Sequence, residues 1–331
     1  MQPHDLLIGL TYDLRDDYLA EGFSLEETAE FDKPDTIAGI ENSLRELGYR
    51  TERIGNAKAL VRALAANRRW DLAFNIAEGM FGVGREAVVP ALLDAYRIPY
   101  TFSDPAVLTI ALDKALTKRI VRDAGVPTAP FACLHAVADI ARVDLPYPLF
   151  LKPLAEGTGK GISNRSKVQN PAELREVATE LLARYHQPVL VETFLPGREF
   201  TVGLAGSGDT AEVLGVIEVN FKTGSGEIYS YQTKTDYEKL VTYTVPDDAV
   251  SREAAQVARS AWQVLRCMDA GRADIRCDAA GRPNFIEVNP LAGLNPTHSD
   301  LPILCRLNGI GFTQLIGRIM TEAVRRNLSN T

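Results

Sequence analysis

Short apolar runs alternate with amphipathic stretches in the N-terminal part of the chain, and this alternation limits the possible folds most strongly. The run from Leu6 to Leu10 is typical of a strand buried on both faces. The stretch from Thr36 to Leu47 has helical periodicity and ends before Gly48, a residue suited to a helix C-terminus. The same alternation recurs at 50–54, 57–66, 71–76 and 86–95. It predicts a parallel sheet covered by helices, in an α/β domain over residues 1–103.

The rest of the chain carries two other patterns. Turn residues at Tyr100–Pro105 mark a boundary, after which we expect a central domain over residues 104–192. Its expected helices and strands are 111–123, 147–152, 172–184 and 188–192. Alternating runs beyond residue 197 are typical of antiparallel strands and predict a C-terminal α+β domain over 193–331. Its later expected elements are helices at 249–267 and 313–325 and strands at 272–277 and 284–288.

The composition excludes several classes of protein. The chain has 331 residues, of which 46% are hydrophobic, and its net charge of −7 disfavours binding to a nucleic-acid backbone. No apolar run approaches the ~20 residues that a bilayer requires, and the N-terminus lacks the features of a signal peptide. The four cysteines form no CxxC pair, which is typical of thiols in a reducing compartment. We therefore expect a cytoplasmic protein with no nucleic-acid or membrane partner.

An acidic segment from Asp13 to Asp35 interrupts the alternation after the first expected strand. The segment is long and has no clear periodicity. Loops at the carboxyl ends of parallel strands often carry function, which favours a role at a binding site. A solvated surface insertion would have the same sequence properties, so both interpretations stay open.

A strand that ends at Lys152 is followed by a glycine-rich loop from Glu156 to Gly161. Glycines allow backbone N–H groups to approach phosphate oxygens, and a lysine adds positive charge at the same place. The spacing differs from a Walker A motif, in which GKS or GKT opens a helix. A surface hairpin turn could contain the same residues, so the motif alone does not identify a phosphate site.

Asp274, Glu287 and Asn289 lie on two expected strands of the C-terminal domain. The separation of 13 residues between the two acids can place their side chains on one face of an antiparallel hairpin, together with Asn289. Oxygen ligands of this kind suit Mg²⁺, although a solvated polar sheet face is the alternative. Arg272 and the turn at 291–296 lie beside them and could stabilise a developing oxyanion.

The expected strand Val189–Glu192 ends where two domains would meet. The backbone edge of such a hinge could bind the edge of an adenine ring, and Glu199 could bind ribose hydroxyls. A strand and a polar turn with a purely structural role would look the same.

The order of these features is more specific than any one of them. Asp113-Lys114, the strand lysine with its glycine-rich loop, the hinge glutamate, Arg-x-Asp at 272–274 and Glu-x-Asn at 287–289 follow one another. This order resembles the ATP-grasp superfamily and, within it, the D-alanine-D-alanine ligase family. The segments that carry the resemblance are PYTFSDPAVLTIALDK (99–114), VLVETFLPGREFTV (189–202) and NPLAGLNPTHS (289–299).

The resemblance implies an α/β and α+β ATP-grasp fold with an N-terminal parallel-sheet domain. It also implies a ligase that forms C–N bonds. ATP would convert a carboxylate into an acyl phosphate, the amine of an amino acid would attack it, and ADP and phosphate would be released. The implied cofactors are ATP and Mg²⁺, with two ions expected and Mn²⁺ as a possible substitute.

The same resemblance implies roles for individual residues. Lys114 and Lys152 would hold phosphates, and Lys234 would approach the γ-phosphate. The other implied nucleotide-binding residues are Glu156, Gly157, Thr158, Gly159, Gly161, Glu192, Phe194, Leu195, Glu199 and Ile286. Asp274, Glu287 and Asn289 would be the metal ligands. Arg272 and the Gly293 N–H would form an oxyanion hole, and Ser299, with Asn295 and His298 beside it, would bind the carboxylate of the second substrate.

The side that binds the first substrate departs from the family pattern. The acidic 13–35 segment replaces a glycine-rich first loop, and residues 74–86 replace an HG..GEDG segment and contain no histidine. Thr235 and Thr158 stand where the family has the tyrosine and serine of a bridging triad. We therefore expect retained nucleotide chemistry and a rebuilt carboxylate pocket. Its expected new contacts are Glu78, Arg85 and the acids of the 13–35 segment.

Two alternative functions remain at this point. One is authentic D-alanine-D-alanine ligation for peptidoglycan synthesis, and the other is a non-catalytic, regulatory ATP-binding protein. The complete set of Arg272, Asp274, Glu287 and Asn289 disfavours the second, because a buried acidic cluster is costly to keep without use. The expected partners are small-molecule substrates, and the resemblance implies a homodimer.

Overall fold

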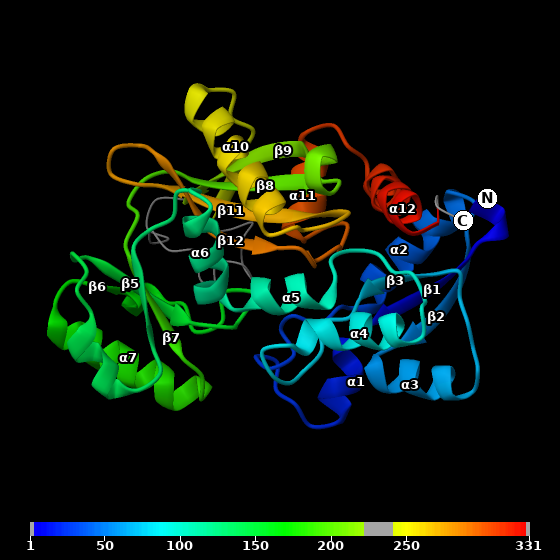
Figure 1. Ribbon diagram of the computed structural model, residues 1–331, viewed down its shortest axis with the longest axis horizontal. Coiled ribbons are helices and arrows are strands. Elements are labelled where there is room, and N and C mark those ends of the chain that lie inside the picture. Colours follow the sequence, from blue (N-terminus) through cyan, green and yellow to red (C-terminus); the bar gives the residue numbers. More distant parts are fainter. Residues whose placement is uncertain (1–2, 222–240, 329–331) are drawn as a thin grey trace.

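The computed structural model describes residues 3–221 and 241–328, which form three β-sheets with helices packed on them (Figure 1). The N-terminal sheet is parallel, with strand order β2-β1-β3. Its strands are β1 (Leu7–Tyr12), β2 (Arg50–Gly55) and β3 (Leu72–Ile76). The helices of this region are α1 (Arg15–Ala20), α2 (Pro34–Glu46), α3 (Ala57–Ala65) and α4 (Val88–Ala95). The parallel sheet predicted from the alternation is confirmed.

Strand β1 lies in the middle of this sheet because its side chains are apolar on both faces. Ile8 and Leu10 are 0% and 1% exposed. Between them, a Cβ atom on Gly9 would lie 2.5 Å from Ile54 and 2.8 Å from Trp70. The close packing at this point therefore requires glycine.

The acidic segment after β1 folds back onto the molecule. It contains α1, and the rings of Tyr18 and Phe31 are buried with their centroids 4.3 Å apart. Asp13 accepts a hydrogen bond from the Tyr18 hydroxyl, and Thr28 is fully buried. The segment is therefore packed onto the molecule through Asp13, Tyr18, Thr28 and Phe31 and is not a purely solvated insertion, although Asp16, Asp17, Glu21 and Glu27 are exposed.

The helix expected at 111–123 is in fact two helices, α5 (Pro105–Leu112) and α6 (Lys114–Asp123). Asp104 caps α5 by accepting from the Val107 N–H, and Asp113 caps α6 by accepting from the Leu116 N–H, both at 2.9 Å. The break places Lys114 in the first turn of α6, where its side chain reaches the glycine-rich loop.

The central sheet is antiparallel, with strand order β4-β7-β5-β6. Its strands are β4 (Phe131–Leu134), β5 (Leu149–Pro153), β6 (Lys167–Val168) and β7 (Val189–Thr193). Helix α7 (Pro171–Tyr185) begins after Asn170, whose side chain caps it, and covers the sheet. The sheet and α7 share a core of their own, which includes Leu149, Leu174 and Val191.

The C-terminal sheet is antiparallel, with strand order β10-β9-β8-β11-β12. Its strands are β8 (Glu199–Ala205), β9 (Glu212–Phe221), β10 (Val241–Thr244), β11 (Ala270–Cys277) and β12 (Pro283–Asn289). Its helices are α10 (Ala249–Val264), α11 (Asp300–Leu307) and α12 (Phe312–Leu328). Short 3-10 turns lie at Pro3–Asp5, Arg85–Ala87, Val137–Arg142, Asn164–Ser166 and Gly208–Thr210.

Helix α12 joins the C-terminal region to the N-terminal one. It packs against α2, and one buried cluster includes Leu44 of α2 together with Leu301 of α11 and Ile316 of α12 (Figure 1). The predicted division at residues 103 and 192 stays a prediction, and the second boundary falls inside β7. Among the described residues, no helix is both long and apolar enough to cross a membrane.

Candidate functional site

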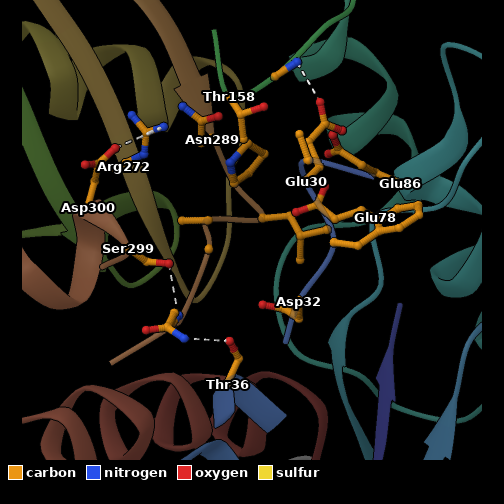
Figure 2. A pocket seen from close by; sticks show the side chains of 18 of the residues that line it. Glu30, Asp32, Thr36, Glu78, Glu86, Thr158, Arg272, Asn289, Ser299 and Asp300 are labelled. Atoms are coloured by element: carbon orange, nitrogen blue, oxygen red, sulfur yellow. Dashed lines mark hydrogen bonds and ion pairs between the residues drawn. The ribbon is translucent and has the colours of Figure 1, made fainter. Parts of the chain in front are cut away.

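A cleft of about 680 Å³ lies where the three regions of the chain meet (Figure 2). Its walls come from the acidic segment, the α5–α6 junction, the glycine-rich loop, and β12 with the loop that follows it. Glu78 lines this cleft together with Gly293 and Ser299, as expected for residues of one substrate site. Arg85 lies behind the wall, where it donates to Glu30 at 2.9 Å and to the Ala155 carbonyl at 3.0 Å.

A chain of buried lysines and glutamates runs from the hinge to the cleft. Lys152 lies 3.4 Å from Glu192 and 3.2 Å from Glu287, and Lys114 lies 3.8 Å from Glu287. Burial alone would lower the pKa of Lys152, but the two glutamates outweigh burial and raise it. The ammonium groups of Lys114 and Lys152 therefore converge on one carboxylate of β12.

Lys118 also belongs to this lysine-glutamate chain, although no sequence motif identified it. Its side chain is 0% exposed, and its Nζ lies 2.6 Å from Glu192 and donates to the Thr128 hydroxyl at 2.6 Å. Burial lowers its pKa, with the nearby Glu192 opposing that effect. One turn after Lys114 on the same helix, Lys118 could have been found from its place on the buried face. The Glu192 carboxylate is thus paired with two lysines, although it was expected to contact nucleotide.

A second, small pocket of about 100 Å³ lies at the hinge. Its apolar lining includes Phe194, Leu195 and Ile286, as expected for a base-binding slot. Arg276 lies over the Phe194 ring, 5.1 Å from its centroid, and donates to Glu199 at 3.0 Å. The lining also contains Lys152, Gly159, Glu192, Asp274 and Glu287, so this pocket adjoins the lysine-glutamate chain.

The glycine-rich loop takes backbone conformations that suit glycine. Gly159 and Gly161 both have φ near 74°, and Thr158 has φ of 50°. A Cβ atom on Gly161 would lie 2.4 Å from the Pro153 ring, so the loop needs glycine there for steric reasons too. Glu156 accepts from Lys114 through its carbonyl at 2.7 Å, which joins the loop to α6.

Glu30 ties the acidic segment to this loop, and the sequence did not predict the contact. Its carboxylate accepts from the Gly157 N–H at 2.8 Å and lies 3.1 Å from the Lys160 ammonium and 2.9 Å from Arg85. Burial opposes its ionisation, but Arg85 and Lys160 outweigh burial and hold the pKa of Glu30 at about 2. Lys160 also pairs with Glu156 at 2.6 Å. Arg85 was expected to contact the substrate in the cleft directly. In the structure its guanidinium group instead holds Glu30 in place.

The proposed metal ligands lie side by side on β11 and β12. Asp274 is directly opposite Glu287, and Asn289 is opposite Arg272. Asp274 accepts from the Thr201 hydroxyl at 2.9 Å and forms an ion pair with Arg272. The Asn289 Nδ2 is buried and has no hydrogen-bond partner in the described part of the chain. Two carboxylates and an amide oxygen on adjacent strands fit Mg²⁺ by their chemistry.

The loop after β12 is fixed by its own hydrogen bonds. The Ser299 hydroxyl accepts from the Asn295 N–H at 3.0 Å, and the Asn295 side chain donates to Asp35 at 3.1 Å and Thr36 at 3.0 Å. A Cβ atom on Gly293 would lie 3.0 Å from the Ser299 hydroxyl, so a larger residue at this position would crowd the Ser299 side chain. Burial and then the charge of Lys33 lower the pKa of His298.

Comparison with known proteins identifies the family of this chain. Residues 120–321 match the family model described as D-ala D-ala ligase C-terminus. The D-alanine-D-alanine ligase of Bordetella petrii is 32% identical over 290 residues, which are 86% of this chain and 83% of that protein. The chain belongs to the D-alanine-D-alanine ligase family.

Solved structures of other D-alanine-D-alanine ligase family members share the ATP-grasp fold of this chain. The Bacillus anthracis D-alanine-D-alanine ligase complexed with ATP has a TM-score of 0.73 at 21% identity, covering 98% of this chain and 100% of its own. The VanG D-Ala:D-Ser ligase from Enterococcus faecalis has a TM-score of 0.73 at 18% identity, covering 96% of this chain and 99% of its own. At these identities the likeness establishes the fold.

Proposed function

We propose that this ATP-dependent ligase joins the carboxylate of one small molecule to the amine of an amino acid through an acyl phosphate. The observation that supports it is one cleft lined by Lys114 and the glycine-rich loop as well as by Arg272, Gly293 and Ser299. A phosphate donor and a carboxylate bound there would be close enough to react. D-alanine-D-alanine ligation, the activity named for the bacterial relatives, is the alternative within this class.

The first step transfers the γ-phosphoryl group from ATP to a carboxylate oxygen, and ADP leaves. Lys114 and Lys152 would hold phosphate oxygens, with the loop from Glu156 to Gly161 over them. Lys234, assigned to the γ-phosphate, lies outside the described residues. Mg²⁺ ions bound by Asp274, Glu287 and Asn289 would neutralise phosphate charge. The apolar pocket with Phe194, Leu195 and Ile286 would take the base, and Glu199 the ribose.

In the second step the amine nitrogen attacks the acyl carbon, and inorganic phosphate leaves as the amide forms. The oxyanion of the tetrahedral intermediate would be stabilised by the Arg272 guanidinium and the Gly293 N–H. Arg272 is held in the cleft by its ion pair with Asp274 and by Asp300 at 3.7 Å. Ser299, with Asn295 and His298 beside it, would bind the carboxylate of the amine substrate.

Release of ADP in the presence of ATP, Mg²⁺ and a panel of D- and L-amino acids tests the ligase proposal, with products identified by mass spectrometry. Arg272→Ala should lower kcat by about 10²–10³-fold, as for the loss of an oxyanion donor, and leave the KM for ATP nearly unchanged. Arg282→Ala is the matched control, since Arg282 is 75% exposed in the turn of the same hairpin. Equal activity of both variants and the parent would contradict the role of Arg272. Sedimentation of the same samples tests the proposed homodimer.

A further inference from the structure

The walls of the cleft carry many carboxylates, and most of them have partners. They belong to Glu30, Asp32, Glu78, Glu86, Glu156, Glu287 and Asp300. Glu30, Glu156 and Glu287 each pair with a lysine. Asp300 accepts from the Tyr243 hydroxyl at 3.1 Å and lies 3.7 Å from Arg272, and Asp32 is hydrogen-bonded to the Thr36 side chain.

Glu78 and Glu86 are the exceptions. Within residues 3–221 and 241–328, neither carboxylate has a hydrogen-bond or ion-pair partner, although both line the cleft and are partly buried (Figure 2). Burial and then the charge of Glu86 raise the pKa of Glu78. Burial raises the pKa of Glu86 to about 7, although Arg85 opposes the effect. Both carboxylates therefore lie where a cation would be stabilised.

The guanidinium group of Arg85 does not neutralise Glu86, because it binds other groups. Arg85 lies next to Glu86 in the chain, but its guanidinium is taken up by Glu30 and by the Ala155 carbonyl. Glu30 is itself saturated by Arg85, Lys160 and the Gly157 N–H, so it is not available to bind an ammonium group of a substrate. Negative charge that can reach a ligand in the cleft thus comes from Glu78 and Glu86, and from Asp32, whose partner is the neutral Thr36 hydroxyl.

A metal ion is a poor match for this pair. Among the described residues, no third His, Cys, Asp or Glu side chain joins Glu78 and Glu86 in a group that could hold a metal ion. An organic ammonium or guanidinium group needs fewer acceptors and is well matched by two carboxylates. The α-ammonium group of an amino acid would neutralise one carboxylate and leave the other without a counter-charge.

We propose that Glu78 and Glu86 bind the positive charges of a basic amino acid, whose carboxylate is the one activated by ATP. The inference rests on the proposed ligase function and names the class of its first substrate. The α-ammonium and a side-chain ammonium or guanidinium group would each face one of the two glutamates. A neutral amino acid would leave one buried carboxylate unpaired, which is costly.

Steady-state kinetics with matched substrates tests this proposal. ADP release is measured with ornithine, lysine, 2,4-diaminobutyrate and arginine against alanine and serine, in both enantiomers. A basic amino acid should have a kcat/KM at least about tenfold above that of the neutral ones. Glu78→Gln and Glu86→Gln should each lower that value about tenfold or more with the KM for ATP unchanged, and the variant that loses the α-ammonium contact should also lower the kcat/KM of neutral amino acids. Glu212→Gln, at a 59% exposed side chain on β9, is the control and should change nothing.

Preference for neutral amino acids, or equal kinetics of the two variants and the parent, would overturn the proposal. Calorimetric binding in the presence of a non-hydrolysable ATP analogue separates this outcome from failure of the ligase proposal. Binding of ornithine or lysine that is lost in Glu78→Gln supports the basic-substrate site even without turnover. Absence of such binding overturns the site, whatever the ligase assay shows.

Discussion

At the residue scale, the buried ion pairs of the lysine-glutamate chain affect stability more than the surface pairs. Lys118 is 0% exposed and its partner Glu192 is 5% exposed. Lys118→Met would leave Glu192 with Lys152 at 3.4 Å and would remove the donor to Thr128. We expect a loss of about 3–5 kcal/mol in the free energy of unfolding, measured by urea denaturation.

A surface pair provides the control for Lys118. Arg318 pairs with Glu212 at 2.7 Å, but the two side chains are 44% and 59% exposed. Arg318→Met should therefore cost about 0–1 kcal/mol. Equal losses in the two variants would mean that burial does not govern the strength of these pairs.

Asp32 should make stability depend on pH. Burial raises its pKa to about 7, and the charges of Asp13, Asp35 and Arg15 also act on it. The folded protein therefore holds a proton that the unfolded chain releases above pH ~4, so this group lowers stability as the pH rises from about 4 to 7. Asp32→Asn removes the effect and should stabilise the protein by about 1 kcal/mol or more at pH 8 but little at pH 4. Urea denaturation at both pH values measures the difference, and a gain that is equal at both would contradict the assignment.

At the element scale, the shape of the glycine-rich loop depends on Gly161. Its φ of 74° and the 2.4 Å approach to Pro153 leave no room for a Cβ atom. Gly161→Ala should displace the loop at a cost of about 1–3 kcal/mol. Because 1.4 kcal/mol corresponds to tenfold, we expect the KM for ATP to rise about tenfold or more in steady-state assays.

A substitution at Gly281 distinguishes backbone strain from a steric clash of the added Cβ atom. Gly281 lies in the turn between β11 and β12 with φ of 79°, and nothing lies within 4 Å of the Cβ position. Gly281→Ala has the same backbone strain without the clash and lies outside the cleft. Its KM for ATP should match that of the parent, and an increase like that of Gly161→Ala would count against a local effect in the loop.

The sequence predicted elements well where one periodicity held over their length. The alternation of β1, α2 and β2 needs local information alone, because the spacing of apolar residues within each element shows whether that element is a strand or a helix. The break at Asp113 was missed because apolar residues continue through it, and the cap that causes it depends on one side chain. The contact from Glu30 to Gly157 spans 127 residues and joins a segment without periodicity to a loop, so no local pattern could predict it.

At the scale of the whole molecule, the three sheets do not have three equivalent cores. The N-terminal sheet shares a buried cluster with α11 and α12 of the C-terminal region, while the central sheet and α7 have a separate one. Figure 1 shows the central sheet and α7 standing apart from the other two sheets. The order of the motifs along the sequence indicated three regions with different patterns. The packing of α12 against α2 is a tertiary contact between distant parts of the chain, which no motif order can predict.

Arg326 of α12 stabilises the contact between the C-terminal helix and the N-terminal region. Its guanidinium donates to the Tyr100 and Phe102 carbonyls at 3.0 and 3.1 Å and pairs with Asp269 at 3.0 Å. Asp269 is fully buried before β11 and also accepts from the Phe102 N–H at 2.7 Å. One side-chain pair thus connects the C-terminal helix, the C-terminal sheet and the segment that leaves the N-terminal sheet.

Arg326→Met should therefore weaken the connection between the N-terminal and C-terminal regions. Buried Asp269 would lose its counter-charge, and we expect a loss of about 3–5 kcal/mol in the free energy of unfolding. Arg325→Met is the matched control one residue away, because Arg325 is 49% exposed and pairs with Glu322 on the same helix, so its loss should stay below about 1 kcal/mol. Urea denaturation followed by fluorescence and by circular dichroism measures both losses. Similar small losses in the two variants would show that apolar packing of α12 on α2 suffices to hold the regions together.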